Sequence, residues 1–211
     1  MTAPTRAALL RLWFTGEASR CEVARRASPR AGPVPAPAPP TPLTSSLLRA
    51  DAVFDASLRP FLALTDALVA GAPPPAEPEL SADEATVAEV LACDQVPRNC
   101  WRGSARAFEG DAFALRRARE AVAAGALERL PRDDEPRRLF LLMPFMHAEE
   151  PAAHAEAEIL WPTANEGFAR DHAAVVKRFA RFPHRNKVLG RASTPEEEAH
   201  LASPERKSWE S

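Results

Sequence analysis

The sequence predicts an all-α fold, a compact array of about seven to nine helices. No segment alternates apolar and polar residues in the way that a half-buried strand would. Apolar residues recur instead at helical spacing, and proline, glycine and capping residues separate one helical pattern from the next. Ala and Leu are abundant, Tyr is absent and there are 8 Gly, a composition that favours helix.

The length and charge of the chain argue against several classes of protein. With 211 residues, 45% of them hydrophobic, the chain can bury a core of its own. A net charge of -2 argues against a general nucleic-acid binder, and no apolar run approaches the roughly 20 residues that span a bilayer. The N-terminus lacks the apolar region of a secretory signal, and Cys21, Cys93 and Cys100 form no disulfide pattern. We therefore expect a cytoplasmic protein with no membrane or nucleic-acid partner, and leave its oligomeric state open.

Three segments differ in composition. Residues 1–17 contain an apolar helix that is too short to be stable unless it packs on the rest of the protein. Residues 18–46 are rich in Pro, Ala and Arg, and we expect this insertion to be disordered because it has little apolar surface to bury. We interpret it as a surface-loop insertion; the alternatives are a proline-rich ligand for a partner, or part of a transit peptide that would send the protein to an organelle. Residues 47–211 form the main all-α domain.

The first helices of the main domain are marked by proline and by a cap. Residues 47–70 place apolar side chains on one face, and Pro60 predicts a kink or a new helix start within them. A capping box at residues 81–84 opens the next helix, which runs toward Asp94 and is ended by Pro97.

The later helices follow the same rules. We expect them at residues 108–124, 133–147, 151–161, about 163–182, and from Thr194 onward. The helix over 133–147 has the densest apolar run and is expected to be the central buried helix, kinked by Pro144. Thr194 and Glu197 fit a second capping box.

Two polar phrases come at proline-broken helix ends and resemble each other. The first occupies residues 94–104 and the second residues 181–197. Each contains Pro, then Arg-Asn, then a second Arg beside a Gly and shortly before a hydroxyl residue. Short connections fixed by helices on both sides favour a binding site over a mobile loop.

These phrases, with Phe54-Asp55, Arg106-Ala107-Phe108 and the segment 144–150, resemble the domain-of-unknown-function 924 family. The resemblance covers nearly everything from residue 50 to residue 203, and Leu12-Trp13-Phe14 resembles the opening helix of the family. It implies an all-α domain similar to tetratricopeptide-like helical folds, and no established activity.

The sequence departs from the family pattern at four places. Val96 replaces the usual Phe of the first phrase, and Ala148-Glu149-Glu150 replace the usual Ser-Glu-Asp after the central His. Glu89 interrupts the apolar run before the first phrase, and the proline-rich insertion replaces the connection between the first two helices. None of these changes removes an Arg, Asn or His of the motifs.

The two phrases predict an anion-binding site, because arginine presents a planar fork of donors that matches carboxylate or phosphate. The predicted ligand-binding residues are Asp94, Arg98, Asn99, Arg102, His184, Arg185, Asn186 and Arg191. The alternative is structural: Arg98 and Arg185 pair with nearby carboxylates and tie helix ends together. Candidates for those carboxylates are Asp94, Glu149 and Glu150. The two interpretations coexist if the pairs leave donors free.

His147 is the predicted catalytic residue, with Glu149 or Glu150 as the carboxylate that orients it. The alternative is a structural histidine satisfied by a backbone carbonyl or a carboxylate, which is also our interpretation of His172. His147, Glu150, His154 and Glu158 have helical spacing, but Pro151 should break the helix between them. We therefore expect no metal ion and no cofactor.

The sequence thus predicts a polar pocket formed by the two phrases and the His147 segment, which binds a small anionic ligand and supports acid–base chemistry. Whether the protein is an enzyme stays open. The alternative is a helical scaffold whose arginines clamp an acidic side chain or the terminal carboxylate of a protein or peptide. A third possibility is that the polar cluster is purely structural.

Overall fold

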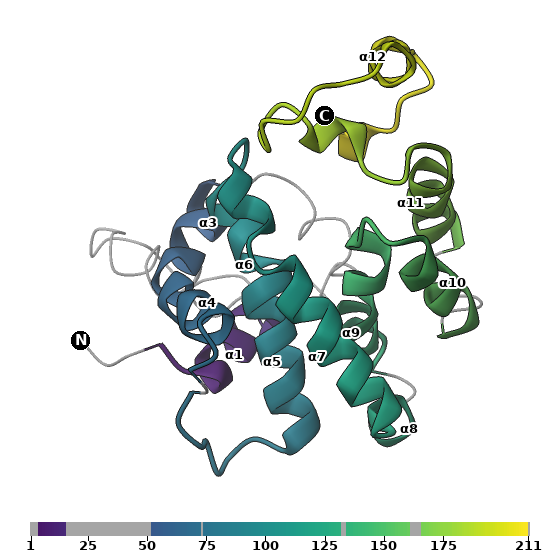
Figure 1. The fold of residues 1–211 in the computed structure, drawn as a ribbon. Helices are drawn as coiled ribbons and strands as arrows, with labels where there is room; N and C mark the ends of the chain where they lie inside the picture. The colour runs from purple at the N-terminus through teal and green to yellow at the C-terminus, as the bar shows by residue number, and fades with distance from the viewer. Residues whose placement is uncertain (1–3, 16–51, 73, 132–133, 161–165, 211) are drawn as a thin grey trace, which may run out of the picture.

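The fold is that of a computed structural model, which describes residues 4–15, 52–72, 74–131, 134–160 and 166–210 (Figure 1). Every regular element within these ranges is helical, so the all-α prediction is confirmed. None of the helices in these ranges has the length and apolar character of a membrane span. The proline-rich insertion at 18–46 lies outside the described residues, and its expected disorder stays a prediction, as does the tetratricopeptide-like arrangement.

The described helices fall into two groups along the chain. The first group, with its 3-10 turns written η, is α1 (Arg6–Thr15), α3 (Ala52–Leu58), η1 (Arg59–Phe61), α4 (Leu62–Val69), α5 (Ala82–Asp94), α6 (Val96–Cys100) and η2 (Ala105–Phe108). The second group is α7 (Asp111–Ala123), α8 (Ala126–Arg129), α9 (Glu135–His147), α10 (Pro151–Leu160), α11 (Glu166–Phe179), η3 (Pro183–Arg185), α12 (Pro195–Ala202) and η4 (Ser208–Glu210).

Proline residues divide the helices, though not always as expected. Pro60 splits the expected helix over 47–70, because η1 separates α3 from α4. Pro97 was expected to end a helix, but it lies in the first turn of α6, where its missing N–H costs no hydrogen bond. Pro144 lies inside α9, and the helix continues to His147.

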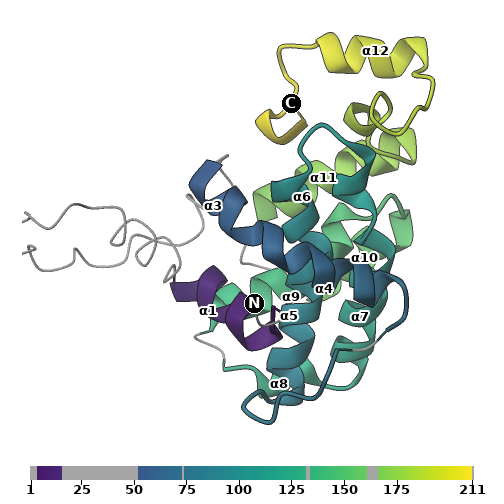
Figure 2. The ribbon, with the colours of Figure 1, turned by 90° about the vertical axis from the view of Figure 1, so that its left-hand side faces the viewer.

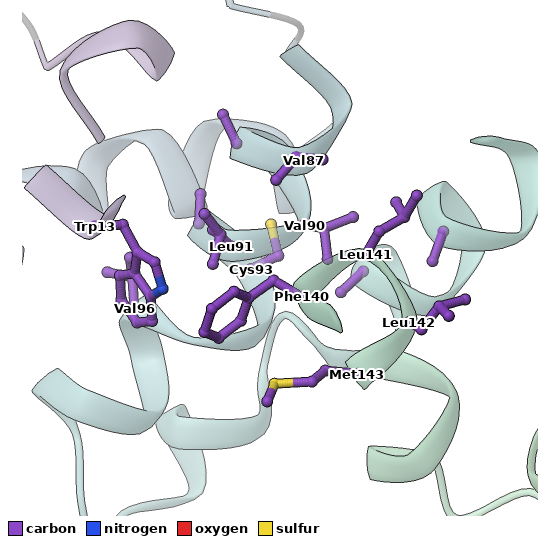
Figure 3. Packing of buried hydrophobic residues seen from close by; sticks show 14 of the residues in the cluster. Trp13, Val87, Val90, Leu91, Cys93, Val96, Phe140, Leu141, Leu142 and Met143 are labelled. Carbon is purple, nitrogen blue, oxygen red and sulfur yellow. The ribbon is translucent and has the colours of Figure 1, made fainter. Parts of the chain in front are cut away.

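α5 is the centre of the core and packs against α1, α4, α7 and α9. Its buried side chains include Val87, Val90 and Leu91, and Figure 3 shows Leu91 on the side of Trp13 of α1 and Phe140 of α9, with Val90 toward Leu141. The Trp13 ring meets the Phe140 ring edge-on, with centroids 5.4 Å apart. The helix over 133–147, expected to be central, is buried over the same apolar run but lies beside α5.

Gly110 allows α7 to begin against the end of α5. A Cβ at this position would lie 2.1 Å from the carbonyl oxygen of Cys93, which is backbone and cannot rotate away. Only glycine permits this approach, and the next residue is Asp111, which is thereby brought to the end of α5.

We expect Gly110→Ala to lower the free energy of unfolding by about 2–3 kcal/mol, because α7 must move away from α5 to admit the methyl group. Gly167→Ala is the matched control. A Cβ there would meet no atom within 4 Å, and Ala is the better helix former, so that variant should be stabilised by up to about 1 kcal/mol. Urea unfolding followed by circular dichroism measures both, and equal effects would contradict the packing argument.

The C-terminal part has a smaller core of its own. Val175, Val176 and Phe182 are buried together, with Trp209 packed against them. Figures 1 and 2 show α12 at the end of the molecule opposite α8, so this core closes the end that carries the second phrase.

Candidate functional site

Five residues, each from a different element, form a closed ring of polar contacts, here called the ion-pair ring. They are Asp94 at the end of α5, Arg98 in α6, Asp111 at the start of α7, His147 at the end of α9 and Arg185 in η3. The two phrases therefore meet, although about 80 residues of sequence lie between them.

Both arginines bind the same carboxylate. Nη1 and Nη2 of Arg98 face the two oxygens of Asp111 at 2.7 and 2.9 Å, and Nη1 of Arg185 donates to Oδ2 of Asp111 at 3.0 Å. Nη2 of Arg185 then donates to the backbone carbonyl of His147 at 3.0 Å. These contacts fix the ends of α6, α7 and α9 relative to η3.

Asp94 closes the ring. Its Oδ1 lies 2.8 Å from Nδ1 of His147 and 3.2 Å from Nη1 of Arg98. The side-chain amide Nε2 of Gln95 donates to its Oδ2. The residue is fully buried. Burial alone would raise the pKa of the Asp94 carboxyl, but Arg98 and His147 outweigh it and hold the pKa below its usual range. Asp94 is therefore a carboxylate at neutral pH.

Arg185 is enclosed between two aromatic rings. Its guanidinium carbon lies 4.4 Å from the centroid of Phe108 and 4.5 Å from that of Phe182. Burial lowers the pKa of the guanidinium to about 10 against the opposing charge of Asp111, so Arg185 stays protonated at neutral pH. Its role in this geometry is to hold Asp111 and the end of α9.

His147 presents one ring nitrogen to the protein and leaves the other open. Because the partner of Nδ1 is the Asp94 carboxylate, Nδ1 carries a proton. Nε2 has no hydrogen-bond partner among the described residues and is not sealed from solvent. The side chain is 14% exposed, whereas that of Asp94 is 1% exposed. A buried carboxylate behind a histidine whose second nitrogen is open is the geometry of a general base.

Arg98 also keeps unused donors. Its two terminal nitrogens bind Asp111, and Nη1 also donates to the backbone carbonyl of Asp94. The N–H of Nε and the outer N–H of Nη2 lie along one edge of the guanidinium and have no partner in the described part of the chain. Nε is also not sealed from solvent. One planar edge of two donors is therefore left, on the side of the guanidinium away from the Nη1 contact with Asp94.

The carboxylates expected to orient His147 bind other residues instead. The chain leaves α9 in an extended conformation at Ala148 (ψ 142°), which turns the following side chains away from the imidazole. Glu149 accepts from Arg191 at 2.6 and 2.9 Å and from the backbone N–H of Phe182 at 2.8 Å. Glu150 is exposed and lies 3.2 Å from Arg119. Asp94, predicted as a ligand-binding residue or as a partner of the arginines, takes the orienting position.

The remaining predicted residues of the second phrase build the turn around the ring. Asn186 accepts from Nε of Arg191 at 3.0 Å and donates to Ser193 at 3.1 Å. The neighbouring Glu197 is buried, and its hydrogen bonds from Arg181, with that from the Thr194 backbone, lower its pKa to about 2. These contacts make the turn rigid and leave Arg191 no role in the ring itself.

The remaining predicted residues of the first phrase point away from the ring. Arg102 is 43% exposed and lies 3.3 Å from Asp55, and its Nη2 donates to Asn99 at 2.7 Å. Asn99 donates to the backbone carbonyl of Gln95 at 2.8 Å. The structure therefore brings together Asp94, Arg98 and Arg185 of the predicted set, with His147, and separates Asn99 and Arg102 from them.

Three further imidazole rings surround Phe182 at the edge of the site. Those of His154, His172 and His184 lie 6.2, 5.7 and 5.6 Å from it, centroid to centroid. Burial lowers the pKa of all three, to about 3 for His172 and for His184. These rings are neutral at pH 7, in contrast with the charged groups of the ion-pair ring.

No metal site is found among the described residues, where no group of three or more His, Cys, Asp or Glu side chains is arranged to hold an ion. Two cavities, of about 390 and 490 Å³, lie elsewhere: the first borders α7 and α10, and the second lies between α5 and α7. Neither borders the ion-pair ring.

Asp111 is the residue that the sequence analysis missed. It was placed inside a helix expected to begin at Phe108, so it carried no special meaning. The signal that could have found it is the pair Gly110-Asp111 at a helix start. A glycine there permits close approach of two backbones, and an acidic residue in the first turn is favoured by the helix dipole.

Comparisons with other proteins agree with the fold. A family model described as "Bacterial protein of unknown function (DUF924)" matches residues 10–205. The solved structure of a protein of unknown function from Agrobacterium tumefaciens, ATU0120, is 32% identical and has a TM-score of 0.62, covering 75% of this chain and 89% of that one. A search of curated proteins found no match.

Proposed function

The chain belongs to the DUF924 family of bacterial proteins of unknown function, and we propose that it binds a small anionic molecule at the ion-pair ring and performs acid–base chemistry on it. The observation that carries this proposal is the open Nε2 of His147, held by the buried carboxylate of Asp94. The DUF924 match gives the family and no activity, so the proposal rests on the geometry of the ring.

His147 acts as the base in this proposal. Nε2 takes a proton from the bound molecule, and Asp94 stabilises the imidazolium that forms without itself accepting the proton. Since Nδ1 is fixed 2.8 Å from the carboxylate, the lone pair of Nε2 is the one available for the reaction. The same nitrogen returns the proton in a later step, which balances the cycle.

Arg98 supplies the binding site for the anionic group. Its open edge offers two parallel donors, and Asp111, Asp94 and the nearby Phe108 ring hold the guanidinium in place before a ligand arrives. The guanidinium, through Nη1, and the imidazole contact the same oxygen of Asp94, so Arg98 and His147 are neighbours in the site.

The structural alternative accounts for the ion pairs but leaves the open groups without a role. An arginine that only ties helices together needs no free edge, and a structural histidine needs no exposed nitrogen. The peptide-clamp alternative requires arginines on an open surface, whereas Arg185 is buried and Arg98 nearly so. These observations favour a small ligand.

We expect Arg98→Lys to weaken the binding of acetate and of inorganic phosphate by tenfold or more, because lysine keeps the charge but has no planar edge of donors. Binding is measured at constant ionic strength, with chloride as the reference, by the shift of the Arg98 Nε–H signal in NMR spectra of the unaltered protein. Fluorescence or calorimetry then compares the variants.

Arg102→Lys is the matched control, because Arg102 lies one turn further along, is 43% exposed and pairs with Asp55. It should bind both anions as the unaltered protein does. If neither anion moves the Arg98 signal, or if both lysine variants lose the same affinity, the proposed binding site is wrong.

A further inference from the structure

His147 and His172 share one arrangement at the edge of the ion-pair ring. The centroids of the two imidazoles are 6.0 Å apart. Nδ1 of His147 faces the Asp94 carboxylate at 2.8 Å, and Nδ1 of His172 faces the backbone carbonyl of Phe168 at 2.7 Å. In each ring the partner of Nδ1 can only accept a hydrogen bond, so Nδ1 carries a proton, and in the neutral form of the ring the lone pair is on Nε2.

His172 keeps this lone pair over the whole neutral range. Burial, with the neighbouring His147 and Arg185, lowers the pKa of His172 to about 3, so the ring is neutral at pH 7. Nε2 makes no hydrogen bond to any described residue and is not sealed from solvent, although the residue is only 6% exposed. The exposed part of this ring is thus available to a donor from outside the protein.

The position of the His172 ring is fixed. Trp209 stacks on it with centroids 3.7 Å apart and an interplanar angle of 13°, and Phe182 meets it edge-on at 5.7 Å. A fixed, neutral acceptor suits recognition, because little conformational entropy is lost when a ligand binds.

We propose that His172 is a second binding residue of the site, which accepts a hydrogen bond from a hydroxyl group of the ligand, and that the ligand is therefore a small hydroxylated carboxylate. This inference rests on the proposed function. Arg98 binds the carboxylate, His147 is the base, and His172 selects molecules that carry a hydroxyl within reach of both rings. Two imidazoles whose centroids are 6.0 Å apart, that of His172 buried and that of His147 partly exposed, can contact one molecule of a few atoms at the same time.

The test compares three pairs of carboxylates that differ by one hydroxyl: acetate with glycolate, propionate with lactate, and succinate with malate. With histidine labelled by ¹⁵N, the Nε2 signal of His172 reports hydrogen bonding at that atom. In at least one pair we expect the hydroxylated member to bind about tenfold more tightly and to shift this signal, as one added hydrogen bond would.

His172→Phe keeps the ring shape and the stacking surface for Trp209 but removes the acceptor. It should abolish the preference for the hydroxylated member while leaving the binding of the plain carboxylate unchanged, and His172→Gln should restore part of the preference. His154→Phe is the control, since Nε2 of His154 is bound to the carbonyl of Ala148 at 2.9 Å and its Nδ1 is sealed. That variant should keep the preference.

The outcomes separate the two proposals. If plain carboxylates bind through Arg98 and no hydroxylated partner binds more tightly, the role of His172 is wrong and the anion site stands. If the preference exists but survives in His172→Phe, another residue provides the acceptor and the inference is wrong. If no carboxylate moves the Arg98 signal, both proposals are wrong.

Discussion

Lowering the pH from 6.5 to 4.5 is expected to remove about 4 kcal/mol from the free energy of unfolding. Burial holds the pKa of His172 and of His184 at about 3 in the folded protein, whereas both have an ordinary value of 6.5 in the unfolded chain. Between those values the unfolded state binds more protons than the folded state does. The stability that these residues provide is therefore complete above pH 6.5 and is lost as the pH falls toward 3.

The charged groups around His172 and His184 lower the pKa of these rings further, or raise it by less than burial lowers it. His147 and Arg185 disfavour a charged His172, and Arg185 disfavours a charged His184 more than Glu149 favours it. Below pH 4.5 the loss of Glu197 adds to the effect, because its pKa of about 2 is below its ordinary value of 4.5 and its stabilisation disappears on protonation.

Urea unfolding at a series of pH values measures the effect. We expect a slope of about 2.7 kcal/mol per pH unit near pH 5, twice the value for one histidine. His172→Phe and His184→Phe should each remove about half of this slope, and the double variant should keep only the contribution of His154, whose pKa burial also lowers. A slope below about 1 kcal/mol per pH unit in the unaltered protein would mean that these rings are already solvated in the folded state.

The helix ends were the most predictable part of the fold, because their chemistry is local. Ser81 with Glu84 and Thr194 with Glu197 each form the reciprocal pair of hydrogen bonds of a capping box, as their three-residue spacing indicates. Pro60 interrupts its helix for an equally local reason. Pro97 was harder, since a proline that cannot continue one helix can begin the next.

The partners of the polar residues were less predictable, because they depend on how distant helix ends meet. Arg98 and Arg185 do converge, but on Asp111, which Gly110 brings to the end of α5. Spacing along the chain favoured Glu149 as the partner of His147, only two residues away. The extended backbone at Ala148 overrides that proximity, and Asp94, 53 residues distant, occupies the position instead.

The ring uses its charges in pairs and leaves only specific edges open. Asp111 and Asp94 neutralise the two guanidinium groups, so the site carries no large excess of charge that would attract anions at random. Specificity must then come from the planar edge of Arg98 and the open nitrogens of the histidines. This arrangement makes Asp94 the residue on which both the fold and the chemistry of the site depend.

We expect Asp94→Asn to lower the free energy of unfolding by about 3 kcal/mol, although the side chain keeps its size. Asp94 accepts at both oxygens, from His147 and Arg98 on one side and from Gln95 on the other. An asparagine must turn its NH₂ group toward one of these donors, so one buried contact becomes repulsive in either orientation. Asp83→Asn is the control, because its partner Arg129 is exposed and that pair should contribute less than about 1 kcal/mol.

The same change should remove the base. Without the carboxylate, Nδ1 of His147 is no longer held as the donor, so the proton can move to Nε2 and the imidazolium loses its counter-charge; turnover of any substrate should then fall on the order of 10⁴-fold, as with the aspartate of a serine-protease triad. The ¹⁵N signals of His147 report the change of tautomer without an assay. Unchanged His147 signals, in a variant as stable as Asp83→Asn, would show that Asp94 does not orient the imidazole, and the acid–base proposal would lose the observation that carries it.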